Sequence, residues 1–244
     1  MSDEREHAEA VAGGGRLDLR ADCERCFALC CVAPAFSPSA DFAIDKAAGR
    51  PCPNLAADFR CGIHTDLRRR GFPGCTVYDC FGAGQKVAQV TFGGQDWRRA
   101  PRTAKRMFEV FTIMRHLHEL LWYLDEALTL EPARPIHGEL RLAFDRTERL
   151  THGDPGTLVE LDVAAHRQEV NALLLRTSEL VRAGVRRGKK DRRGADLIGA
   201  DLRDADLSGA DLTGSIFLIQ SQLQSAKGDA GTKLPPSLTH PAHW

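Results

Sequence analysis

The sequence carries no cysteine after Cys80, although it has 244 residues and eight cysteines in all. It also carries no net charge, since 33 basic side chains balance 33 acidic ones. This balance removes the long-range attraction that would favour nucleic acid or an anionic membrane as the main partner. We therefore expect neither of these partners.

Long apolar runs are absent as well. No run of 18 apolar residues could span a bilayer, and the N-terminus, "MSDEREHAEA", begins acidic and lacks the apolar core of a secretory signal. These absences favour a cytoplasmic protein. In a reducing cytosol, clustered cysteines are more typical of metal binding or redox chemistry than of structural disulfides.

Familiar catalytic and nucleotide-binding motifs are missing too. The chain contains no GxSxG, no HExxH and no P-loop, and no GxGxxG follows a strand. The catalytic residues are therefore unknown, and no binding site for an organic cofactor is predicted. Nothing in these absences decides between an enzyme and a non-catalytic protein.

Cysteine, by contrast, is concentrated near the N-terminus. Four cysteines lie in "DCERCFALCC", residues 22–31, and four more follow in "PCPNLAADFRC" and "GCTVYDC". If the first segment is one helix, Cys23, Cys26 and Cys30 share a narrow arc of its surface, with Cys31 on the flank. The candidate metal ligands are all eight: Cys23, Cys26, Cys30, Cys31, Cys52, Cys61, Cys75 and Cys80.

The segments "CERCFALCC", "PCPNL", "RCGIH" and "GFPGCTVYDC" resemble the CxxCxxCC cysteine-cluster (YkgJ-like) family, described as zinc- or iron-chelating. The resemblance covers residues 23 to about 85 and implies metal binding by the cysteines. The opening motif differs, because it reads CxxCxxxCC in this chain. Flagellin lysine methylases carry a similar cluster, so a modification enzyme remains an alternative.

The identity of the metal stays open between zinc and iron–sulfur. Eight thiolates could make two zinc sites of four cysteines, or one iron–sulfur cluster with the other four in a zinc site or free. Adjacent cysteines rarely reach the same ion, so we expect Cys30 and Cys31 to have different roles or to bridge within a cluster. His64 also has chelating spacing from Cys61, but the cysteines already suffice.

Helical periodicity dominates the middle of the chain. A long helix is predicted from Thr103, as its cap, to Pro132; a second covers 135–150 and a third covers 157–184. The predicted apolar stripe of the long helix is Met107, Val110, Phe111, Met114, Leu117, Leu121, Leu124 and Leu128. That of the third helix is Val163, Val170, Leu173, Leu174 and Leu180.

A five-residue repeat, "GADLIGADLRDADLSGADLTGSIFL", occupies residues 194–218. It resembles the pentapeptide-repeat family, which implies a right-handed quadrilateral β-helix, of about one coil here. Such a short coil should lean on the third helix, with the tail as a cap. Long members of that family mimic DNA and bind topoisomerase, so a topoisomerase partner is a minor alternative. One coil in a chain without net charge fits DNA mimicry poorly.

Together these patterns predict a mainly α protein, in which a metal-organised Cys-rich module packs on a helical middle. The expected parts are a flexible tail (1–18), the Cys-rich module (19–87), the helical region (88–185), a basic linker (186–193) and the repeat segment with its cap (194–244). We expect a metalloprotein that offers its repeat or helical surface to a protein partner. The alternative is an iron–sulfur redox protein or modification enzyme.

Overall fold

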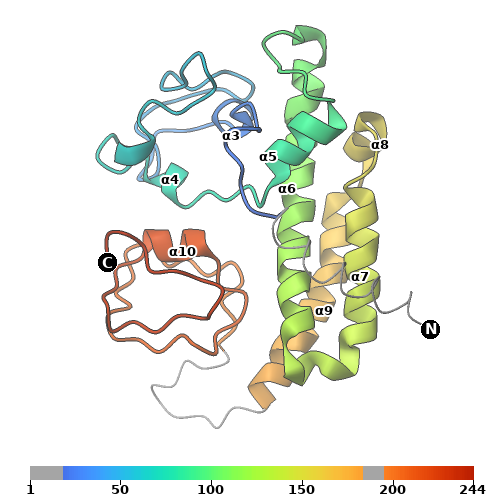
Figure 1. Ribbon diagram of the computed structural model, residues 1–244, viewed down its shortest axis with the longest axis vertical. Coiled ribbons are helices and arrows are strands. Elements are labelled where there is room, and N and C mark those ends of the chain that lie inside the picture. Colours follow the sequence, from blue (N-terminus) through green and yellow to red (C-terminus); the bar gives the residue numbers. More distant parts are fainter. Residues whose placement is uncertain (1–18, 184–194) are drawn as a thin grey trace, which may run out of the picture.

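The computed structural model describes residues 19–183 and 195–244, and it is mainly helical (Figure 1). The long helix α6 (Pro101–Thr129) forms the axis, with α7 (His137–Leu150) and α9 (Val163–Ala183) packed along it. The predicted tail and the predicted basic linker lie outside the described residues.

The bounds of α6 differ slightly from the prediction. Pro101, not Thr103, opens the helix, because its fixed φ suits the first helical position and its missing N–H costs nothing there. The Thr103 hydroxyl donates instead to the Ala100 carbonyl, at 3.0 Å. Beyond Thr129 the chain continues as a 3₁₀ helix, η3 (Glu131–Ile136), before α7.

The predicted third helix is wrong in its continuity. It is divided into α8 (Pro155–Glu160) and α9, because Leu161 is extended, with ψ of 126°. Each new start has an aspartate cap: Asp154 accepts from the Gly156 N–H at 2.8 Å, and Asp162 accepts from the Ala165 N–H at 2.9 Å. Two helix caps eight residues apart favour two separate helix starts over one long helix.

The predicted apolar stripe of α6 is confirmed and supplies two apolar clusters. Its N-terminal half packs against Leu29, Val32 and Val87 of the cysteine region. Its C-terminal half packs against α9 and against Ile216 and Phe217 of the repeat segment. Helix α6 therefore packs against both the cysteine region and the repeat segment.

The cysteine region has only short elements: α3 (Leu29–Val32), the 3₁₀ turn η1 (His64–Asp66), α4 (Pro73–Thr76), α5 (Ala83–Gln85) and the π-helical turn η2 (Lys86–Thr91). Residues 22–31 do not form one helix, so the condition for a shared arc of Cys23, Cys26 and Cys30 is not met. Phe27 and Ala28 are left-handed, with φ of 49° and 53°, so the helix begins only at Leu29. Cys23 and Cys26 consequently lie in a loop.

The repeat segment turns its leucines inward. Leu197, Leu202 and Leu207 pack with the buried Leu212 and with side chains from the C-terminal tail, which include Leu223, Leu238 and Trp244. Parallel bridges pair Asp196 with Ile216, Asp206 with Lys227 and Asp211 with Lys233. Among the described residues these pairings are isolated bridges, and no continuous strand forms.

The tail does more than the predicted capping, since it pairs with the repeats and also supplies a short helix, α10 (Gln220–Ser225). This helix lies beside α4 of the cysteine region (Figure 1). Arg203 pairs with Asp41 at 2.6 Å, and the Arg68 guanidinium donates to the Gln224 carbonyl. The repeat segment thus contacts the cysteine region as well as the helices.

Candidate metal centre

The eight cysteines are contributed by loops and very short helices. Cys30 and Cys31 lie on α3, Cys75 lies on α4, and Cys80 precedes α5. All eight are free thiols, and Cys23 is the one whose residue is exposed. Every predicted ligand is therefore in a part of the chain that the structure describes.

We call Cys23, Cys26, Cys30 and Cys80 the first set, in which the Cys26 thiol lies 3.6 Å from the Cys23 carbonyl. Gly84 lies against Cys26, since a Cβ built on it would be 2.7 Å from the Cys26 Cβ. Cys30 and Cys80 pack against the apolar cluster of the α6 N-terminal half. Glutamine amides tie the Cys23–Cys26 loop to this region: Gln85 donates to the Arg20 carbonyl and Gln89 to the Arg25 carbonyl, each at 2.7 Å.

Charge and hydrogen bonding divide the thiols of the first set. The hydrogen bond with Cys26 lowers the pKa of Cys23 to about 6, against the effect of burial, and the charges of His64 and Arg60 act in the same direction. The same hydrogen bond, followed by burial, raises the pKa of Cys26. Burial raises the pKa of Cys80, which the N–H groups of Gly84 and Gly82 oppose.

Cys31, Cys52, Cys61 and Cys75 form the second set, around the apolar cluster of Phe36, Leu67 and Phe72. Backbone bonds hold their loops together. The Cys52 N–H donates to the Cys31 carbonyl at 3.0 Å, and Cys61 pairs with Leu55 in an antiparallel bridge. The Cys75 N–H donates to the Phe72 carbonyl at 3.1 Å, so α4 is fixed to the same cluster.

Burial is the largest influence on the pKa of Cys75 and of Cys61 in the second set. It raises the pKa of Cys75 to about 12 and also raises that of Cys61, where the Ile63 N–H acts in the opposite direction. The pKa of Cys31 is lowered, first by its hydrogen bond with Cys30, and the positive charge of Lys46 assists.

Lys46 is a buried cation beside the second set. Its ammonium contacts four backbone carbonyls, those of Pro34 at 2.5 Å, Arg50 at 2.9 Å, and Val32 and Ala47 at 3.3 Å. Burial lowers the pKa of Lys46, whereas the charges of Cys52 and Cys31 act to raise it. Nothing in the sequence pattern marks this lysine, because all four partners are backbone carbonyls.

The two sets meet at Cys30 and Cys31, whose Sγ atoms are 3.9 Å apart. Within residues 19–183 and 195–244, no three cysteine, histidine or acidic side chains are close enough to hold an ion in the positions shown. Ligation therefore requires the thiols to come closer together than they lie in these positions. The donors of both sets are sulfur alone, which suits zinc and iron–sulfur centres.

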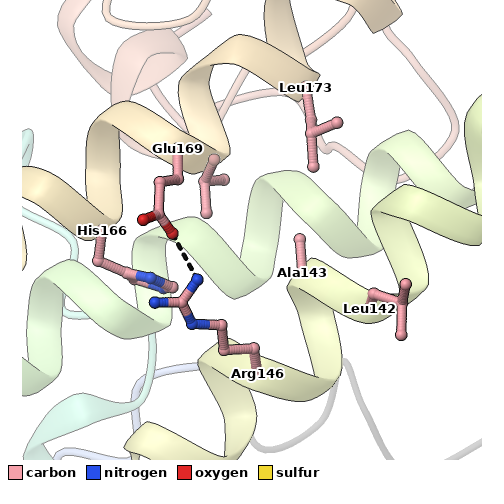
Figure 2. Close-up of a pocket in the computed structure, with 7 residues that line it drawn as sticks. Leu142, Ala143, Arg146, His166, Glu169 and Leu173 are labelled. Carbon is pink, nitrogen blue, oxygen red and sulfur yellow. Dashed lines mark hydrogen bonds and ion pairs between the residues drawn. The ribbon is translucent and has the colours of Figure 1, made fainter.

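A hollow between α7 and α9 was not foreseen from the sequence (Figure 2). It is lined by Leu142, Ala143, Arg146, His166, Glu169, Val170 and Leu173. Arg146 points across it to Glu169, with a 2.5 Å ion pair, and His166 lies beside them. Arg146 and Glu169 neutralise each other, so we interpret the hollow as a feature of the packing of α7 against α9.

The helices in the described part of the chain are all too short or too polar to cross a bilayer. This agrees with the absence of long apolar runs in the sequence.

Comparison with known proteins confirms the repeat and identifies a full-length relative. The model for pentapeptide repeats (8 copies) matches residues 193–217, whereas no cysteine-cluster family matches. No solved structure matches the chain. The uncharacterized protein YybG of Bacillus subtilis (strain 168) is 52% identical over 265 aligned positions, which cover 93% of this chain and 95% of that protein. The chain therefore belongs to the same family as YybG, with the pentapeptide-repeat segment as one of its parts.

Proposed function

We propose that this protein binds metal, zinc or iron–sulfur, through its eight cysteines, and that the metal organises residues 19–87. The observation that carries the proposal is the gathering of eight free thiols into one small region that has little regular structure. Such a region gains ordering energy from metal ligation that its short elements cannot supply.

Strained backbone next to the cysteines supports the proposal. Phe27, Ala28, Phe59 and Phe81 all have positive φ, and each lies within three residues of a cysteine. Such conformations cost about 1–3 kcal/mol each and persist where the surroundings impose them. Thiolate–metal bonds would provide that restraint, since they fix the chain on both sides of each ligand.

Backbone N–H groups directed at sulfur give a second argument. Ala28 donates to Cys26, Ile63 donates to Cys61, and both Gly82 and Gly84 donate to Cys80, and in each case the N–H opposes the net rise of the thiol pKa. These donors favour the thiolate, the form that binds metal. The chain thus supplies, before any metal binds, part of the stabilisation that a coordinated thiolate needs.

The remaining parts fit a non-catalytic role in the cytoplasm. We propose that the helical region (88–185) is the scaffold, and that the segment 194–244 forms a short right-handed quadrilateral β-helix of about one coil. The parallel bridges and the inward leucines support this geometry. The exposed face of the repeats would then be available to a protein partner.

Metal analysis of the full chain, purified without oxygen and without chelators, tests the proposal together with an absorption spectrum. We expect tightly bound metal: zinc with no visible absorption, or iron and sulfide with a brown colour. Removing the metal should unfold the cysteine region, as judged by hydrogen exchange at its backbone amides. A chain that is folded, reduced and free of metal would overturn the proposal.

A further inference from the structure

We infer that the eight cysteines form two separate four-thiolate sites, with the first set in one, the second set in the other, and the division between Cys30 and Cys31. This inference rests on the proposed metal binding and assigns each ligand to a site. It answers a question that the sequence leaves open, namely how two adjacent cysteines are used.

Packing separates the two sets. In the first set, Cys30 and Cys80 contact the cluster built on α6, and Cys26 contacts Gly84 of α5. In the second set, all four cysteines belong to the separate cluster of Phe36, Leu67 and Phe72. Each set therefore has its own apolar surroundings, which is the arrangement that two closed four-thiolate sites need.

Basic residues are placed at both sites. Four thiolates around a divalent ion leave a net charge of about −2, and a buried charge without compensation is unstable. Lys46 lies beside Cys31 and Cys52 of the second set. His64 and Arg60 act on Cys23 of the first, and the Arg60 guanidinium is also paired with Glu24 at 2.6 Å. Each site thus has its own source of positive charge.

Exposure predicts which site exchanges its metal more readily. Cys23 is exposed, whereas the members of the second set are buried or half-buried. A competing chelator should therefore reach the first set sooner. The second set, in which no cysteine is exposed, should retain its ion longer.

Stepwise metal removal from the wild-type chain tests the assignment without any substitution. The zinc-loaded protein is titrated with a chelator, pulsed with an alkylating reagent, and mapped by mass spectrometry of its peptides. We expect Cys23, Cys26, Cys30 and Cys80 to become modified together, with release of one zinc ion. The other four should follow together with a second. Modification of Cys30 and Cys31 in the same step, or of all eight in one, would overturn the division.

Paired substitutions provide an independent measurement. Cys23→Ser and Cys30→Ser, alone or combined, should each lower the zinc content from two ions to one. Cys30→Ser combined with Cys31→Ser should abolish it. If that pair still leaves one ion, the two residues share a site and the inference is wrong. A wild-type chain that binds no metal would instead contradict the proposed function itself, so the two failures are distinguishable.

Discussion

Gly84 of α5 lies so close to Cys26 that a Cβ built on it would be 2.7 Å from the Cys26 Cβ. Backbone N–H groups of Gly82 and Gly84 also donate to the thiol of Cys80. Residues 82–84 therefore contact two cysteines of the first set. Gly84 lies against Cys26, and the N–H groups of Gly82 and Gly84 donate to Cys80. This contact brings together residues more than fifty positions apart in the sequence.

Substitution of Gly84 tests this contact. Gly84→Ala should lower the free energy of unfolding by about 1–3 kcal/mol, because the added methyl group overpacks a site with no free space. It should also accelerate zinc loss from the first set while the second is unchanged. The matched control is Gly138→Ala in α7, where a Cβ would meet nothing within 4 Å. Urea unfolding that shows equal stability for both variants would contradict the contact.

The buried ammonium of Lys46 gives the second prediction. Lys46→Met keeps the length of the side chain but removes the donor to the carbonyls of Pro34 and Arg50. The free energy of unfolding should fall by at least about 1–3 kcal/mol, the cost of leaving a buried polar group unsatisfied. Lys105→Met on α6 is the control, because that side chain is 91% exposed. An equally small effect of both substitutions would mean that Lys46 has no structural role.

Periodicity was sufficient for the helices because a helix is a local structure. The stripe from Met107 to Leu124 is buried as its spacing predicts. The break at Leu161 was not predicted, because a continuous apolar pattern runs across it. The cap that starts α9 is a single hydrogen bond, which the Asp162 side chain accepts. Burial in a helix bundle is read easily from a sequence, whereas a cap that interrupts a regular pattern is not.

The cysteine region was harder to predict for the opposite reason. Its shape depends on left-handed residues such as Phe27 and Ala28, which no propensity favours, and on contacts such as that of Gly84 with Cys26. Spacing identified the eight candidate ligands, but their grouping depends on loops that meet in space. Lys46 illustrates this best, because its partners are carbonyls that a sequence does not display.

Docking of the repeat segment on the helices gives the third prediction. Phe217 is fully buried and meets Tyr123 of α6 edge to face, with ring centroids 5.7 Å apart. Phe217→Ala should cost about 3–5 kcal/mol of unfolding free energy, as deletion of a core aromatic ring does. Leu142→Ala, at a side chain on α7 that is 71% exposed, is the control and should be close to neutral. A neutral Phe217 variant would show that the repeat segment does not depend on α6.

The last prediction concerns stability and pH at His166 of α9. Its Nε2 lies 3.0 Å from the Thr147 hydroxyl, which itself lies 2.8 Å from the Ala143 carbonyl. Because the one hydroxyl proton goes to that carbonyl, the neutral imidazole donates from Nε2, and its Nδ1 is buried without a hydrogen-bond partner.

Burial, with help from the charge of Arg146, lowers the pKa of His166, and Glu169 acts weakly against them. The unfolded chain, with an imidazole pKa of about 6.5, then binds more protons than the folded chain below that pH. Stability should therefore be constant above about pH 6.5, fall as the pH drops below it, and level off below the folded-state pKa.

His166→Gln should remove this decline. Urea unfolding of both proteins between about pH 5.5 and 8 measures it, and the difference curve cancels the other titrating groups, which both chains share. A difference curve that is flat, or that favours the wild type at acid pH, would show that His166 is not held neutral by its surroundings.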